Sequence, residues 1–263
     1  MNRSWLPLAV FTALGIVQWT HDLSWWAQLR EVLPILLCLP LTFWLGMPWT
    51  PRDTPKRAMP WWWVLLAPAG VLLHSATLLA AATAAGWITW ADTWLQDRSR
   101  GRAIRLTPVM LMAFPFITLD WQALGWLYRY SGAWAASKVF SAVDLDVLHN
   151  GTEVQIEGVL LQVDASCAGL HTLQVMLALG MALAAVLAGE SRYYWVNLPL
   201  LLALSWLANT ARVIALAAVG LIWGVAAAES WLHEWGGLSV VFVMFLLSWP
   251  VIRWIGRMGR ARP

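Results

Sequence analysis

The sequence predicts an all-α polytopic membrane protein with about eight transmembrane helices and a small extracytoplasmic hairpin-like segment. Of its 263 residues, 60% are hydrophobic and 12% are charged, whereas soluble domains carry about 25% charged residues. The apolar residues form long runs, and about 20 helical residues are enough to cross the hydrocarbon core of a bilayer. Many of the 22 tryptophans stand at the ends of these runs, as membrane-interface anchors do.

The first half of the chain contains two predicted spans, a basic loop and a long apolar run. The spans are expected at residues 5–19 and 32–49, and the loop at residues 50–57. Residues 60–95 are apolar for about 35 positions, which is roughly 50 Å as a helix and too long for one upright span. Two short spans that turn within residues 74–83 are favoured, and one long tilted span is the alternative.

The second half alternates between basic or polar segments and apolar runs. Spans are expected at residues 107–126, 168–188, 194–220 and 238–252. The basic segment 97–105 is expected to be a loop. Because Lys and Arg concentrate in cytoplasmic loops, this segment, the basic loop and the arginine-rich tail are placed in the cytoplasm, together with both termini. A polar segment at residues 128–166 and a short connection at 224–235 then face outward.

The polar segment 128–166 carries a turn signal and an alternating pattern. Asn150-Gly151 favours a tight hairpin turn. Apolar residues stand at 154, 156, 159, 161 and 163 and alternate with polar or small ones, which is typical of strands with one buried face. A short hairpin is therefore expected on the outer side.

The sequence DASCAGLHTL, residues 164–173, closes the polar segment and opens an apolar run. Cys167 would then lie at a helix N-terminus, where unsatisfied N–H groups and the helix dipole favour a thiolate. Asp164 or Ser166 could cap this helix, although the Asp164 charge opposes thiol ionisation. Taken alone, such a cysteine is more often a small packing residue.

Polar residues in the later segments make the functional reading stronger. Ser205, Asn209 and Arg212 stand at i, i+4 and i+7 and share one helical face. An arginine within a span is costly and usually faces a polar cavity, the alternative being one that reaches the headgroups. His233 lies just before the last span. A thiol, a guanidinium and an imidazole are thus expected at one depth on the outer side.

These residues carry a family resemblance. Cys167-Ala168-Gly169-Leu170 resembles the Cys-Ser-Gly-Leu signature of the exosortase/archaeosortase family, and Asn209-Thr210-Ala211-Arg212 resembles its Asn-x-x-Arg motif. His233, three residues before Gly236, resembles its following His motif. The similarity covers residues 106–254. Ala168 replaces the usual Ser, and His171 stands where many members have Arg, which affects the expected substrate class more than the chemistry.

The resemblance implies a multi-pass cysteine protease or transpeptidase of the bacterial inner membrane, with its active site facing outward. Its substrates would be exported proteins whose C-terminus carries a short motif, one membrane helix and a basic tail. The enzyme would cleave at the motif and transfer the protein to a surface acceptor, a polysaccharide or a lipid. Residues 1–105 would be N-terminal spans of unassigned role, 106–255 the catalytic membrane core and 256–263 a basic cytoplasmic tail.

Roles for the site residues follow from that chemistry. Cys167 would be the nucleophile, His233 the general base and then acid, and Arg212 the oxyanion partner. Asn209 would orient Arg212 or donate to the same oxygen, and Gly169 would let the substrate backbone approach closely. No metal or cofactor is expected.

Three alternatives remain open. Water could replace the acceptor, so that the enzyme is a plain intramembrane protease. His171, four residues after Cys167, is a second candidate base. A protein of another class, a transporter or assembly factor, could use Arg212 as an anion site. No feature indicates nucleic-acid binding.

Overall fold

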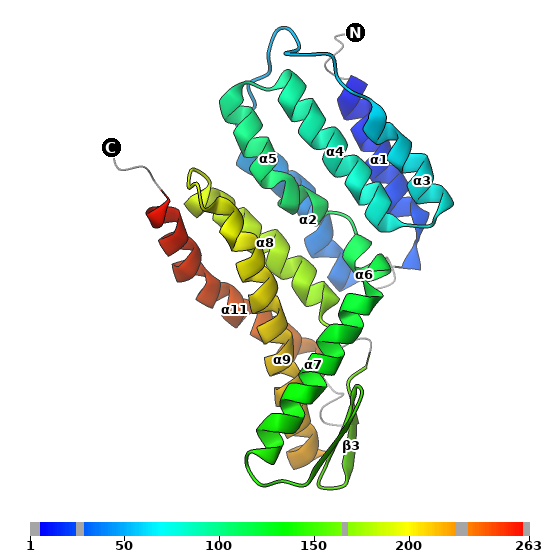
Figure 1. Cartoon of the computed structure of the whole chain (residues 1–263), viewed down its shortest axis with the longest axis vertical. Helices are drawn as coiled ribbons and strands as arrows, with labels where there is room; N and C mark the ends of the chain where they lie inside the picture. Colours follow the sequence, from blue (N-terminus) through cyan, green and yellow to red (C-terminus); the bar gives the residue numbers. More distant parts are fainter. Residues whose placement is uncertain (1–5, 25–28, 165–167, 225–230, 260–263) are drawn as a thin grey trace. The chain divides into compact units, whose positions relative to one another are not determined.

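The computed structural model describes the chain except residues 1–5, 25–28, 165–167, 225–230 and 260–263 (Figure 1). The chain is mostly helical and divides into two compact units. The first unit comprises Met1–Asp120, Leu177–Asn197 and Ile252–Pro263, and the second comprises Trp121–Met176 and Leu198–Val251.

The first unit is built around one helix, α4. Its helices up to residue 120 are α1 (Leu6–His21), α2 (Leu29–Gly46), the 3₁₀ turn η2 (Trp62–Leu65), α3 (Leu66–Leu72), α4 (Ala76–Trp94), α5 (Asp97–Leu111) and α6 (Phe116–Asp120). α4 packs against α1, α3, α5 and α6. Its sequence is rich in Ala, Gly and Thr, and small side chains let helices approach closely. At Gly86 the Trp63 ring lies so near that an added Cβ would stand 2.8 Å from it.

The apolar run 60–95 breaks into two helices near the predicted turn, and whether each crosses the membrane stays a prediction. α3 ends at Leu72, His74 has a positive φ of 50°, and Ser75 caps α4 by accepting a hydrogen bond from the Leu78 N–H. The two helices pack on each other, with Gly70 against Leu79. The run is therefore not one long tilted helix.

The basic segment 97–105 is helical, so its prediction as a loop is wrong. It forms the first part of α5, with Ser99, Ala103 and Leu106 buried. The arginines of this segment occupy the more exposed faces of an amphipathic helix, a pattern that a loop assignment from charge alone overlooks.

One further predicted boundary is wrong, and one predicted loop is confirmed. Residues 107–126 are not one span, because α5 ends at Leu111, α6 covers only Phe116–Asp120, and Pro115 lies in the break. A proline cannot donate the backbone hydrogen bond that would continue the helix. The predicted loop 50–57 is confirmed, and it runs beside the end of α4, where the Arg52 N–H donates to the Trp94 carbonyl at 2.7 Å.

The second unit combines long helices with a small sheet. Its elements are α7 (Gln122–Ser141), β1 (Val147–Asn150), β2 (Glu153–Ile156), β3 (Val159–Gln162), and parts of α8 (Leu170–Ala188), α9 (Asn197–Trp223) and α11 (Trp231–Met258). A short turn, η4 (Tyr194–Val196), precedes α9. α7 includes the first part of the predicted polar segment, so that segment is shorter than expected.

The sheet confirms the predicted hairpin and adds a strand to it. Its strands are antiparallel in the order β1-β2-β3. Asn150 pairs with Glu153 across the first turn, where Gly151 has φ +62°. In the second turn Glu157 and Gly158 both have positive φ, the sign pattern of a type I′ hairpin turn. Val154 and Ile156 of β2, together with Val163 just after β3, are buried in one core with residues of α7 and α9.

Three helices in the described part of the chain are long and apolar enough to cross a membrane. They are Leu170–Ala188, Tyr194–Trp223 and Ser239–Met258. Ile35–Gly46 and Trp62–Leu72 are shorter apolar helices. The total of eight spans stays a prediction.

Candidate functional site

The candidate site of the second unit is framed by α7, which packs against the start of α8 and along α9. At Gly125 an added Cβ would lie 3.1 Å from Leu170 and 3.2 Å from Ala168. On the same helix, the Tyr128 hydroxyl lies 3.0 Å from the hydroxyl of Ser205 in α9, and this pair is buried. The absence of a side chain at Gly125 thus brings α7 close to the residues that follow Cys167.

Two more contacts fix the rotation of α9 against α7. The Trp206 indole N–H donates to the Ser131 hydroxyl at 2.8 Å. Gly132 lies against Val213, with an added Cβ 3.1 Å from a Val213 methyl group. This rotation buries one polar face of α9.

The predicted polar face of α9 is largely confirmed. Ser205 and Asn209 are fully buried, with 0% and 1% exposure. Arg212 is half-buried. Polar groups in such positions are retained where they have partners or a cavity to face, so this face is the polar side of an otherwise apolar helix.

Gly169 joins the two main motifs. It has φ +72°, and an added Cβ would stand 2.5 Å from Asn209 Cγ and 2.6 Å from its Oδ1. Its carbonyl accepts a hydrogen bond from the Leu173 N–H at 2.8 Å, at the first turn of α8. The Cys-x-Gly and Asn-x-x-Arg segments are therefore in direct contact, through a glycine that no other residue could replace without movement of Asn209.

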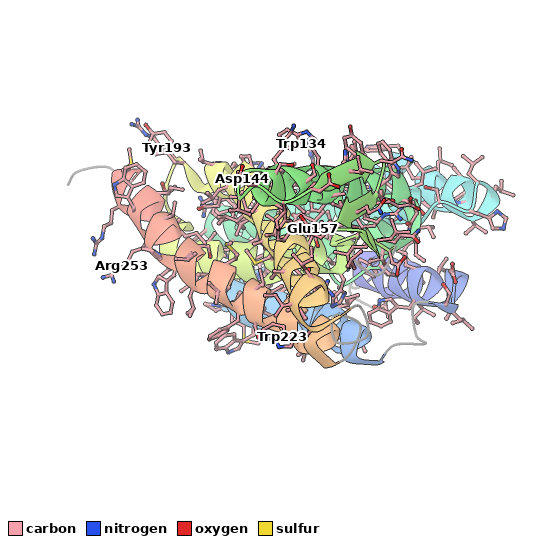
Figure 2. The ribbon with its side chains drawn as sticks, turned by 90° about the horizontal axis from the view of Figure 1, so that it is seen from below. Trp134, Asp144, Glu157, Tyr193, Trp223 and Arg253 are labelled. Carbon is pink, nitrogen blue, oxygen red and sulfur yellow. The ribbon has the colours of Figure 1, made fainter. Side chains whose placement is uncertain are left out.

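The sheet anchors the chain on the other side of the cysteine segment. Val163, just after β3, belongs to the same buried cluster as Val213 and Ala217 of α9. Residues 164–168 thus connect one anchor at Val163 to a second anchor at Gly169, and both anchors pack with α9 near Arg212. Figure 2 shows side chains of the described residues, including Glu157 in the turn before β3.

Several predicted site residues lie wholly or partly outside the described residues. Cys167 and Ser166 are not described, and for His233 the structure gives only its backbone, in the first turn of α11. The predicted connection 224–235 is consequently shorter than expected, because helix α11 already begins at Trp231. Gly236 and Gly237 stand within this helix.

Asp164 is exposed and cannot be the N-cap of α8, because the helix begins six residues later at Leu170. Gly169 holds the capping position instead. The same boundary bears on His171, the second candidate base. It is half-buried in the first turn of α8, but Cys167 precedes the helix, so the i, i+4 spacing does not bring these two residues to one helical face.

Sequence reasoning missed two buried polar residues of this unit. Gln174 is 1% exposed within the apolar run of α8, and Tyr128 is the hydroxyl partner of Ser205. An amide inside a membrane-length helix is itself a signal of an internal polar contact. Tyr128 offered no such signal, since tyrosines at membrane interfaces are common.

No group of three or more His, Cys, Asp or Glu side chains that could hold a metal ion occurs among the residues that the structure describes.

Comparison with known proteins gives one result. The family model described as transmembrane exosortase (Exosortase_EpsH) matches residues 25–249. The match begins well before the first motif and includes α2 to α5. No curated protein and no solved structure shows significant similarity to the chain.

Proposed function

The chain belongs to the transmembrane exosortase family, and from this premise we propose that it is a membrane-embedded cysteine transpeptidase that cleaves C-terminal sorting signals. Its substrates are exported proteins that end in a short motif, one membrane helix and a basic tail. It transfers them to a surface acceptor, a polysaccharide or a lipid. Residues 106–255 form the catalytic core, residues 1–105 are N-terminal spans of unassigned role, and residues 256–263 are a basic tail.

The contact between Gly169 and Asn209 is the observation that carries this proposal. It brings the segment that contains the cysteine against the helix that carries Arg212, three residues beyond Asn209 and nearly one turn along α9. Cys167 is two positions before Gly169, so covalent geometry limits the separation of their Cα atoms to roughly 7 Å. The contact therefore supports a site in which the Cys167 thiol and the Arg212 guanidinium, which come from separate segments, act together.

The proposed reaction uses these groups in two steps. The Cys167 thiolate attacks the scissile carbonyl, a thioester forms, and the C–N bond to the sorting helix breaks. His233 takes the thiol proton and gives it to the leaving amine. Arg212 stabilises the oxyanion of each tetrahedral intermediate, as a cation in a dry site does strongly. In the second step His233 takes the proton of the acceptor's nucleophilic group, which attacks the thioester carbonyl; the C–S bond breaks and Cys167 leaves as the thiolate.

The candidate spans and the charges support a proposed membrane orientation. Leu170–Ala188 leads from the cysteine segment to the turn at Glu190-Ser191-Arg192, and the last span ends with Arg253 and Arg257. The positive-inside rule places these arginines in the cytoplasm. The start of α8 then lies at the outer side of the bacterial inner membrane. Arg212 stands roughly 22 Å along α9, toward the same side.

The test is processing of a tagged sorting-signal substrate by the membrane-embedded enzyme. Cys167→Ala should abolish cleavage. Arg212→Lys should reduce it by roughly 100-fold or more, since lysine keeps the charge but loses the planar fork of two donors. Arg129→Lys, a half-buried arginine of α7 in the same unit, is the matched control and should retain cleavage.

Trapping of the acyl-enzyme assigns the base in the same assay. His233→Ala should accumulate no thioester, whereas His171→Ala should form it. The reverse pattern would make His171 the base. Cleavage by Cys167→Ala at the wild-type rate would instead favour the transporter or assembly-factor reading.

A further inference from the structure

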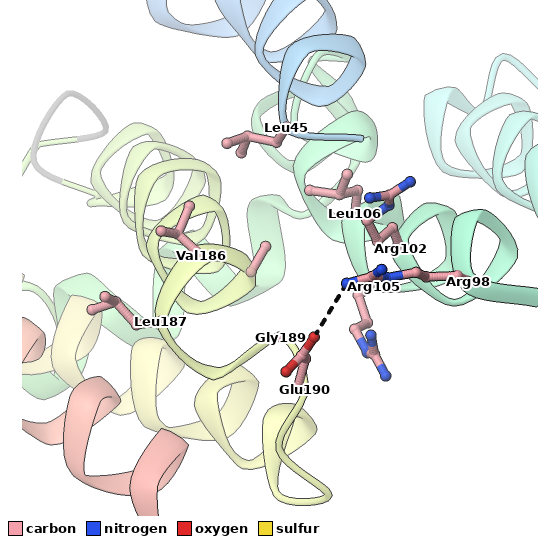
Figure 3. A pocket seen from close by; sticks show the side chains of 10 residues that line it. Leu45, Arg98, Arg102, Arg105, Leu106, Val186, Leu187, Gly189 and Glu190 are labelled. Carbon is pink, nitrogen blue, oxygen red and sulfur yellow. Dashed lines mark ion pairs between the residues drawn. The ribbon is translucent and has the colours of Figure 1, made fainter. Parts of the chain in front are cut away.

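A basic cavity lies in the first unit, whereas Gly169, Asn209 and Arg212 belong to the second unit. It measures about 270 Å³, and α5 lines one side and the end of α8 the other (Figure 3). Its charged lining residues are Arg98, Arg102, Arg105 and Glu190. All ten lining residues belong to the first compact unit.

The three arginines share one face of α5 because they stand at i, i+4 and i+7. Three guanidinium groups against one carboxylate give the cavity a formal net charge of +2, from 3 − 1. The Glu190 carboxylate neutralises the positive charge of the arginines only weakly, because it lies 4.0 Å from Arg98 and both side chains are more than 80% exposed.

The other arginines of this region already have carboxylate partners. Arg52 pairs with Asp97, while Arg57 and Arg100 both pair with Asp92. Within the described residues, Arg102 and Arg105 have no ion pair. Arg102 donates to the Pro48 carbonyl and to the Ser99 hydroxyl, and its buried Nε has no hydrogen-bond partner among those residues. The positive charge of the cavity is thus left for an external anion.

The remaining walls are apolar, and part of them belongs to the end of the membrane-length helix α8. Leu45, Leu106, Val186 and Leu187 line the cavity beside the arginines. Val186 is 63% exposed, only two residues before the candidate span ends at Ala188. Guanidinium groups next to exposed aliphatic side chains, where a helix leaves the bilayer, form the setting of a lipid phosphate group.

We propose that this cavity binds the phosphate headgroup of an anionic lipid. Guanidinium forks suit phosphate oxygens, which accept paired hydrogen bonds from them. The cavity is smaller than the roughly 300–1,000 Å³ of drug-sized ligand pockets, so it takes a headgroup while the acyl chains stay in the bilayer along Val186. A free phosphate ion offers the same chemistry but gains nothing from the apolar wall.

The experiment measures the thermal unfolding midpoint of the full-length protein in neutral detergent. Dioleoyl phosphatidylglycerol should raise Tm by roughly 5–10 °C at about 100 times its Kd, and dioleoyl phosphatidylcholine should not. Arg98→Gln with Arg105→Gln should remove the shift. This double substitution leaves the hydrogen bonds of Arg102 in place. Arg253→Gln with Arg257→Gln removes the same charge from exposed positions of α11 outside the cavity and should keep the shift.

A second variant tests the charge argument in the opposite direction. Glu190→Gln removes, from an exposed position, the one carboxylate among the described residues that line the cavity, and it should tighten phosphatidylglycerol binding by about two- to fivefold. A full shift in the Arg98/Arg105 double variant, or no tightening in Glu190→Gln, would overturn the site. An equal shift with inorganic phosphate at the same concentration would overturn the lipid as its source. None of these readouts depends on substrate cleavage.

Discussion

At the scale of single residues, Gly169 is the position at which one added methyl group tests the proposed site. Gly169→Ala places a Cβ 2.5 Å from Asn209 Cγ at φ +72°, so Asn209 must move, and the left-handed backbone costs roughly 1–2 kcal/mol more. Substrate processing should fall to near zero. Gly158→Ala is the matched control, because Gly158 also has a positive φ but nothing within 4 Å of an added Cβ.

The two variants separate backbone strain from displacement of Asn209. Gly158→Ala should lower the thermal midpoint yet keep processing, and Gly169→Ala should lower both. Wild-type processing by Gly169→Ala would contradict a catalytic role for the Gly169–Asn209 contact. The sequence predicted which residues share a face of α9, because spacing determines that. It could not predict the contact with Gly169, because that contact depends on tertiary packing.

At the scale of elements, the start of α4 is held by a residue from another helix. Asp120, at the end of α6, accepts hydrogen bonds from the Thr77 N–H at 2.7 Å and the Ser75 hydroxyl at 2.9 Å, and a longer one from the Ala76 N–H. A carboxylate at a helix N-terminus accepts hydrogen bonds from backbone N–H groups that have no partner within the helix, and its negative charge interacts favourably with the helix dipole. Asp120→Ala should therefore lower the unfolding free energy by about 1–2 kcal/mol.

The effect of Asp120 should depend on pH in a defined direction. Burial raises the pKa of Asp120, but the hydrogen bonds from Thr77, Ser75 and Ala76 outweigh it and hold the pKa below its usual value. The stabilisation is thus present above the unfolded-state pKa of about 3.9 and is lost as pH falls through the lower folded-state value. Thermal midpoints of wild type and Asp120→Ala should differ at pH 7 and converge in strong acid. A constant difference would contradict the cap.

Helix boundaries show where prediction from the sequence stopped. The break near His74 and the turn at Asn150-Gly151 were predictable, because apolar length and turn chemistry are local. The helical state of residues 97–105 was not predicted. A segment with so many charges is typical of a loop. That it forms an amphipathic helix is shown only by the burial of Ser99, Ala103 and Leu106 along one face.

At the scale of the whole molecule, the membrane class and the family followed from composition and three short motifs, since both depend on local signals. The division into two units did not, because α8, α9 and α11 each contribute to both. Helix length alone does not determine the number of spans, since α4 contains 19 residues but is absent from the candidate spans.

The orientation of the whole chain can be tested with single cysteines in a Cys38→Ala, Cys167→Ala background. Asn150, at the end of β1, and Asp144, shortly before β1, are exposed, while Asp53 and Arg192 are exposed in the predicted cytoplasmic loops. A membrane-impermeant maleimide should label cysteines at 150 and 144 in intact spheroplasts. It should label those at 53 and 192 only after permeabilisation, because α8 separates Asn150 from Arg192 and positive loops stay inside. Equal labelling of 150 and 192 in intact spheroplasts would show that α8 does not cross the membrane.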